Sequence, residues 1–355
     1  MVKIYTEWDP LREIIVANCY NINRINVDLS FKYFFHENLK DGFVKNSISL
    51  QQKIVEQRQE DLDSFSDFLI KKKIEVSRPQ KLEEIKKFNT PEFSDWTCPV
   101  INPRDQVLVY GNEIIETSCI WRMRYFENDL MKDSFRKYFL KGSRWICSPR
   151  PVMNDESYDF EFKDDLDEIA NGPFKNFEIM FDGAQCLKFG KDILMNISNR
   201  NHYLGYLWLR GHLGEDVKIH PVCLTDHHID GMLMPLAPGV VLINSSSMKQ
   251  KIERLPKELQ KWKYIQVPVP HDAPCGIDET YLASQNINVN ILSLSEKEVV
   301  TFNEDGNPDH ALAETLAKNG FNVHTVKLRH SRLFGGGLHC STLDMVRDGE
   351  QGKYF

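Results

Sequence analysis

The sequence feature that most constrains the fold of this chain is a repeated unit. Each copy opens with a polar residue, continues through a short apolar strand, a tight turn and a second strand, and ends in a connection that carries a helix. We count four clear copies, with strand pairs at 106–116, 186–195, 232–244 and 288–300, and a partial first copy at 8–18. The irregular spacing between copies argues against a solenoid. A closed ring of α/β units fits better, because it leaves no open sheet edge and directs the residue that opens each copy toward a shared axis.

The segments around these strand pairs predict helices and further strands. Apolar residues of the segment 51–71 fall on one helical face, for example. The expected helices lie at 51–71, 124–141, 201–213 and 308–318. The expected single strands lie at 11–18, 74–76 and 323–328. The stretch 20–49 is polar and aromatic without a clear period, and the sequence predicts no element there.

The composition is that of a globular protein. The 355 residues are 41% hydrophobic and 27% charged, and they allow one large domain or two ordinary ones; the ring favours a single domain over 1–355. A net charge of −7 argues against a broad nucleic-acid surface. The eight cysteines are scattered without zinc-binding spacing, as expected for reduced thiols. Because the chain shows no apolar signal core and no apolar run near 18 residues, we expect a cytoplasmic protein without a membrane span.

A glycine-rich loop near the end of the chain delivers a cysteine. Gly335, Gly336 and Gly337 allow the backbone to approach a ligand closely, and Cys340 follows them. A loop of this kind predicts a cysteine nucleophile. A tight turn before a buried structural cysteine explains the same residues.

The polar residues that open the repeat copies are candidates for a site. They are Asp105, Asp182, and His228 with Asp230. Taken singly, Asp105 and Asp182 are also ordinary turn residues. His228 lacks the i,i+4 partner of a helical zinc site, and no second cluster supplies further ligands, so we expect no metal and no cofactor.

Taken together with Cys340, these residues define a chemistry. Paired carboxylates match the planar fork of a guanidinium group and compensate its charge once water is excluded. A thiolate can add to the electrophilic central carbon, and a histidine can carry the proton to the departing amine. The set therefore predicts covalent catalysis on an arginine-like substrate.

Many motifs along the chain carry a resemblance to a known family. They lie at 7–9, 102–105, 111–116, 121–127, 181–184, 190–193, 203–205, 228–230, 235–239 and 335–340. In this order they are similar to the arginine:X amidinotransferases, which include glycine-type enzymes and members of the streptomycin, cylindrospermopsin and saxitoxin pathways. The resemblance implies a five-bladed α/β propeller, and it allows a homodimer, since family members are often dimers.

The resemblance also implies roles for single residues. Cys340 matches the nucleophile that forms an amidino-cysteine, His228 the acid/base, and Asp182 the residue that orients the histidine and holds the guanidinium. Asp105 and Asp230 match the arginine-binding acids. Ser284 falls where the family has a substrate-binding serine, and Gly337 lies in the loop that closes over the substrate. The implied partners are L-arginine as donor and an amine as acceptor, with ornithine released.

The chain departs from the family pattern on the acceptor side. Glycine-type members carry an arginine that grips the carboxylate of glycine, and here the same span is Asn244-Ser245-Ser246-Ser247. Because Ser247 cannot replace a bidentate cation, we expect an acceptor other than glycine, in specialised metabolism. Gln185 also stands where the family has a second acid. Two alternatives stay open: a deiminase-type hydrolase that forms citrulline, and a guanidine-binding protein without turnover.

Overall fold

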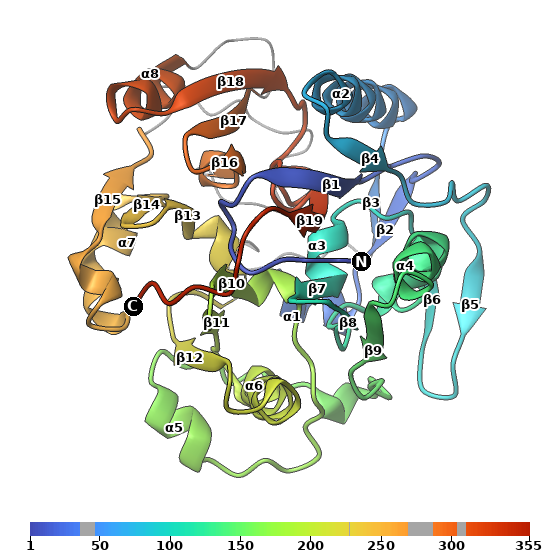
Figure 1. Ribbon diagram of the computed structural model, residues 1–355. Helices are drawn as coiled ribbons and strands as arrows, with labels where there is room; N and C mark the ends of the chain where they lie inside the picture. The colour runs from blue at the N-terminus through green and yellow to red at the C-terminus, as the bar shows by residue number, and fades with distance from the viewer. Residues whose placement is uncertain (36–46, 227, 269–286, 304–309) are drawn as a thin grey trace.

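The computed structural model describes residues 1–35, 47–226, 228–268, 287–303 and 310–355. Within these ranges, five three-stranded sheets surround a common axis (Figure 1). Each sheet is one blade of an α/β propeller, which confirms the predicted ring. No helix among the described residues is long and apolar enough to cross a membrane.

Four blades share one plan. An antiparallel hairpin comes first, and a third strand then pairs in parallel with the second strand of the hairpin, after a connection through helices. Short turns at Gly111, Gly190 and Gly239, all with positive φ, join the hairpin strands. The four blades are β7 (Val107–Tyr110), β8 (Glu113–Glu116) and β9 (Arg144–Cys147); β10 (Cys186–Phe189), β11 (Asp192–Asn196) and β12 (Lys218–Val222); β13 (Leu233–Ala237), β14 (Val240–Ile243) and β15 (Lys263–Gln266); and β16 (Leu292–Ser295), β17 (Glu298–Asn303) and β18 (Asn322–Lys327).

Both ends of the chain build the remaining blade. Strand β1 (Leu11–Val16) pairs in parallel with β4 (Glu75–Ser77) and antiparallel with β19 (Thr342–Arg347), as Figure 1 shows in blue and red. The C-terminal strand thus takes the place that the first hairpin strand has in the other blades. The sequence predicts β1 and β4 but misses β19, because its pairing partner lies more than 300 residues away.

The four longer helices pack on the outside of the ring (Figure 1). The longer ones are α2 (Gln52–Lys71), α4 (Lys132–Phe139), α6 (Arg200–Leu213) and α8 (His310–Lys318). The shorter ones are α1 (Leu29–Phe34), α3 (Pro103–Gln106), α5 (Leu166–Asn171) and α7 (Ser246–Gln250). The expected helix at 124–141 is wrong in its first part, where 3-10 turns at Arg122–Arg124 and Glu127–Met131 precede α4. The physical reason is that buried Arg124 turns inward to Asp105 and Glu127.

The stretch 20–49 carries β2 (Arg24–Asn26), α1 and β3 (Ser47–Ser49), although the sequence predicts no element there. A second small ribbon, β5 (Lys87–Asn89) with β6 (Ser94–Trp96), also lies outside the blades. Aromatic rings of α1 pack on Trp121, and Phe34 also reaches the ring of His228. Helix α1 therefore covers one side of the site described below.

Candidate active site

The residues that precede the first strand of each hairpin converge at the axis. Asp105 lies in α3 before β7, Asp182 begins the turn before β10, and Asp230 lies in the 3-10 turn before β13. Asn290 comes just before β16, and Cys340 just before β19. The repeated plan of the blades therefore gathers these side chains, because every hairpin starts at the same end of the ring.

Cys340 is buried between an acid and an amide. Its Sγ lies 3.2 Å from Oδ2 of Asp230 and 3.1 Å from Nδ2 of Asn290. Burial, with the negative charges of Asp230 and Asp105, raises the pKa of the Cys340 thiol well above its ordinary value. The free protein therefore holds a neutral thiol, and a cation placed against these acids would favour the thiolate.

His228 lies between two carboxylates. Its Nε2 is 2.9 Å from Oδ2 of Asp182, and its Nδ1 is 3.7 Å from Oδ1 of Asp105. Burial alone would lower the pKa of His228, but Asp105 and Asp182 outweigh it and raise the pKa to about 9. The ring is therefore an imidazolium at neutral pH and can donate a proton.

Two buried carboxylate oxygens, Oδ1 of Asp105 and Oδ1 of Asp230, accept no hydrogen bond from any residue that the structure describes. Oδ1 of Asp105 faces Nδ1 of His228 only at 3.7 Å. The other oxygen of Asp105 accepts from Nη1 of Arg124 at 2.6 Å, and that of Asp230 lies 2.7 Å from Nδ1 of His339. Each acid is thus held through one oxygen and can accept a hydrogen bond with the other, a pattern that a planar guanidinium group would satisfy.

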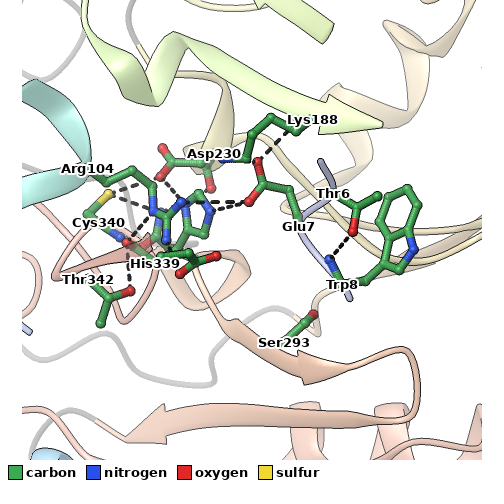
Figure 2. Close-up of polar contacts among 12 residues, drawn as sticks. Thr6, Glu7, Trp8, Arg104, Lys188, Asp230, Ser293, His339, Cys340 and Thr342 are labelled. Carbon is green, nitrogen blue, oxygen red and sulfur yellow. Dashed lines mark hydrogen bonds and ion pairs between the residues drawn. The ribbon is translucent and has the colours of Figure 1, made fainter. Parts of the chain in front are cut away.

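A network of buried charges supports Asp230 (Figure 2). Nε2 of His339 lies 3.3 Å from Oε2 of Glu7, and the other oxygen of Glu7 accepts from Lys188 at 2.8 Å. Burial would raise the pKa of Glu7, but Lys188, His339 and Arg104 bring it well below its ordinary value. Burial would likewise raise the pKa of Asp230, but His339 and His228 lower it. Asp230 therefore stays charged, although it is buried.

Sequence reasoning missed several of these supporting residues. Glu7 lies in the motif 7–9 and His339 adjoins Cys340, but the sequence predicts no function for either residue. Asn290 opens the last repeat copy, so its place in the repeat was the signal that could have found it. Arg124 lies in the motif 121–127 but received no role, and its partner Asp105 belongs to the same blade. Lys188 carries no such signal, because its partner Glu7 lies in the N-terminal segment, far away in the sequence.

The glycine loop packs too tightly for side chains. A Cβ on Gly336 would lie 2.6 Å from Cβ of Cys340, and a Cβ on Gly337 would lie 2.7 Å from the carbonyl oxygen of Asn290. The glycines therefore let the loop sit directly on the neighbouring blade. The close contact of Gly337 with Asn290 therefore helps to set the position of Cys340, three residues further along the chain.

The structure gives less information on the remaining predicted residues, Ser284, Ser247 and Gln185. Ser284 lies outside the described residues. Ser247 lies in α7, whose first turn is capped by Ser245, and the Ser247 side chain is outside the description. Gln185 accepts the backbone N–H of Asp182 at 2.8 Å and donates to the carbonyl of Asn196 at 2.9 Å. The amide at this position therefore serves to hold Asp182.

Metal ligation does not suit the described part of the site. No group of three or more His, Cys, Asp and Glu side chains within the described ranges is placed to hold a metal ion. The donors present are instead arranged as single acids, each with its own positioning partner. Fold and site together define an α/β propeller of the class that modifies guanidino groups.

Comparisons with known proteins identify the family. No family model matches the chain. It is 33% identical to the L-arginine:L-lysine amidinotransferase of Pseudomonas savastanoi pv. phaseolicola, over 99% of this chain and 96% of the relative. It is 32% identical to the mitochondrial glycine amidinotransferase of Xenopus tropicalis, over 99% and 84%. The structure of the inosamine-phosphate amidinotransferase from Streptomyces griseus superposes with a TM-score of 0.85 at 29% identity, covering 100% of this chain and 99% of the other. The chain belongs to the amidinotransferase family, whose members transfer amidino groups.

Proposed function

We propose that this enzyme moves the amidino group of L-arginine to an amine other than glycine, through a covalent intermediate on Cys340, and releases ornithine. The observation that carries the proposal is a pair of buried carboxylate oxygens beside a buried thiol: Oδ1 of Asp105 and Oδ1 of Asp230 accept no hydrogen bond within the described ranges. The deiminase-type and silent alternatives are not favoured, because the relatives above are named as amidinotransferases.

The first half-reaction begins when the guanidinium binds between Asp105 and Asp230. Its charge offsets those acids, so the thiol of Cys340 gives its proton to solvent and becomes a thiolate. The Sγ–Cζ bond forms, and His228 gives its proton to the nitrogen that becomes the δ-amine of ornithine. The bond between that nitrogen and Cζ then breaks. An amidino group remains on the sulfur, and His228 is neutral.

The second half-reaction reverses these steps with another amine. The acceptor nitrogen attacks Cζ and passes a proton to neutral His228. The C–S bond breaks, and the sulfur leaves as a thiolate. A guanidino product forms, and the imidazolium is restored. When the cationic product leaves, the thiolate takes a proton back from solvent and the starting thiol returns. Asp182, which contacts His228 at 2.9 Å, keeps the ring oriented in both halves.

The expected acceptor follows from a missing cation. Glycine-type members of the family carry an arginine where this chain has Ser247, and a serine cannot form a bidentate pair with a carboxylate. Glycine should therefore bind poorly as acceptor. The relative from Pseudomonas is named for lysine, which makes lysine the first amine to test.

The test measures ornithine release from arginine in the presence of glycine, lysine or a carboxylate-free amine. We expect release with at least one amine other than glycine, and little with glycine. Brief exposure to arginine alone should add one amidino group to Cys340, detected by mass spectrometry. Cys340→Ala should abolish transfer, whereas Cys147→Ala, which removes an exposed thiol, should not. Citrulline formation without any added amine, or unchanged activity of Cys340→Ala, would contradict the proposal.

A further inference from the structure

We propose that Asn290 is a catalytic residue of this enzyme, which donates a hydrogen bond to the Cys340 sulfur and stabilises it as a thiolate. This inference rests on the proposed function of Cys340 as nucleophile. It goes beyond that function, because it names the group that holds the negative charge on sulfur in both half-reactions.

The orientation of the Asn290 amide follows from its neighbours. Oδ1 accepts the backbone N–H of Cys340 at 2.9 Å, and this position requires an oxygen because an N–H can only donate. The other atom of the amide, Nδ2, must then carry the two N–H donors. It lies 3.1 Å from Sγ of Cys340 and 3.2 Å from the carbonyl oxygen of Asp230. All three contacts agree, so the group that faces the sulfur is a donor.

The two side chains that contact the sulfur act differently during the reaction. In the free protein the thiol can donate to Asp230 while it accepts from Asn290. A bound guanidinium engages the carboxylate of Asp230, which ends the role of that acid as acceptor for the thiol. The contact from Asn290 depends on its own amide and on backbone groups, so it persists when the proton has left.

The place of Asn290 in the fold suits this role. It stands before β16, where other blades carry Asp105, Asp182 and Asp230. A carboxylate there would repel a thiolate, whereas an amide offers donors without charge. Asn290 is fully buried, so water does not compete for the contact.

The backbone of Asn290 also keeps this contact at a constant distance. Its carbonyl oxygen accepts the N–H of His339 at 3.2 Å, and the absent side chain of Gly337 lets the loop rest against the same oxygen. The segment that carries Cys340 is therefore docked on Asn290 through both backbone and side chain. When the amidino-cysteine collapses and charge returns to sulfur, the donor is already in place.

The test measures the ionisation of the Cys340 thiol directly and does not require amidino transfer. Iodoacetamide alkylates thiolates, so the alkylation rate of Cys340 from about pH 7 to about pH 10, followed on its peptide, reports the thiolate fraction. We expect Asn290→Ala and Asn290→Asp each to slow alkylation about tenfold at a given pH, because one lacks the donor and the other places an acceptor beside the sulfur. The turnover number for arginine should fall with them, with little change in KM.

Paired variants separate ionisation from loop support and from access. Asn290→Ala opens space beside the sulfur and could change the access of iodoacetamide, whereas Asn290→Asp does not. Asn290→Asp also keeps an acceptor for the Cys340 N–H, so it serves as the test if the alanine variant fails to fold. Asn102→Ala is the matched control, since Asn102 donates to the carbonyl of Phe334 at 2.9 Å and supports the same loop. Its alkylation profile should match the wild type. Wild-type alkylation in both Asn290 variants, or equal slowing in Asn102→Ala, would overturn the inference, and neither result depends on whether amidino transfer occurs.

Discussion

At the residue scale, the site works by holding charges that a buried environment would otherwise neutralise. Asp230 stays ionised because His339 faces one oxygen, and His228 stays protonated because two acids face its ring. Each charged group thus keeps the form that the proposed mechanism requires. A cationic substrate would compensate the buried acids, which explains how a buried site can bind a charged group.

This arrangement predicts the alkaline limb of the pH profile. Because the acids raise the pKa of His228 to about 9, kcat/KM for arginine should fall above about pH 9, where the imidazolium is lost. Asp182→Asn removes an anionic partner, so the pKa of His228 falls and the limb should move down by about 1 pH unit. His220→Gln, which alters a histidine paired with Asp192, is the control and should leave the limb unchanged. A limb that stays in place in Asp182→Asn would show that it belongs to another group.

At the element scale, the glycine loop places Cys340 against the neighbouring blade. Gly337→Ala would place a Cβ 2.7 Å from the carbonyl oxygen of Asn290 and the same distance from the ring of Phe302. The loop must then lift, and we expect kcat to fall about tenfold or more, since a displacement near 1 Å is costly for a positioned group. The measurement is steady-state kinetics on a variant whose circular dichroism shows that it is folded.

A second glycine supplies the control for this prediction. Gly211 lies in α6, and a Cβ there meets nothing within 4 Å. Gly211→Ala should leave kcat unchanged and stabilise the fold by about 0.5–1 kcal/mol, because alanine loses less backbone entropy in a helix. Equal activity of the two alanine variants would show that the loop tolerates the added methyl group.

At the scale of the whole molecule, buried ion pairs join the blades where the ring closes. Arg347 of β19 pairs with Asp344 at 2.8 Å and donates to the carbonyl of Ser293 in β16 at 2.8 Å. Asp344 also binds Arg104 of α3 at 2.7 Å. A buried ion pair thus joins two blades, and a hydrogen bond from Arg347 joins the third.

Breaking this junction should destabilise the entire ring. Arg347→Met leaves Asp344 with one partner fewer and unpairs the carbonyls of Asp9 and Ser293, so we expect a loss of about 3 kcal/mol in the free energy of unfolding. Arg12→Met breaks the exposed pair with Asp348 and should cost less than about 1 kcal/mol. Urea denaturation of both variants makes the comparison. Equal costs would mean that the buried network is not what holds the first blade closed.

The sequence by itself determined the repeated hairpins, the ring, and the set of Cys340, His228 and the acids that open the copies. These are local signals, because strand periodicity, turn glycines and polar residues at strand starts are read within a few residues. Only the tertiary structure decided that β19 closes the first blade, that Asn290 contacts Cys340, and that His339 and Glu7 support Asp230. Each of those facts depends on contacts between residues far apart in the chain, and such pairings leave no periodic pattern in the sequence.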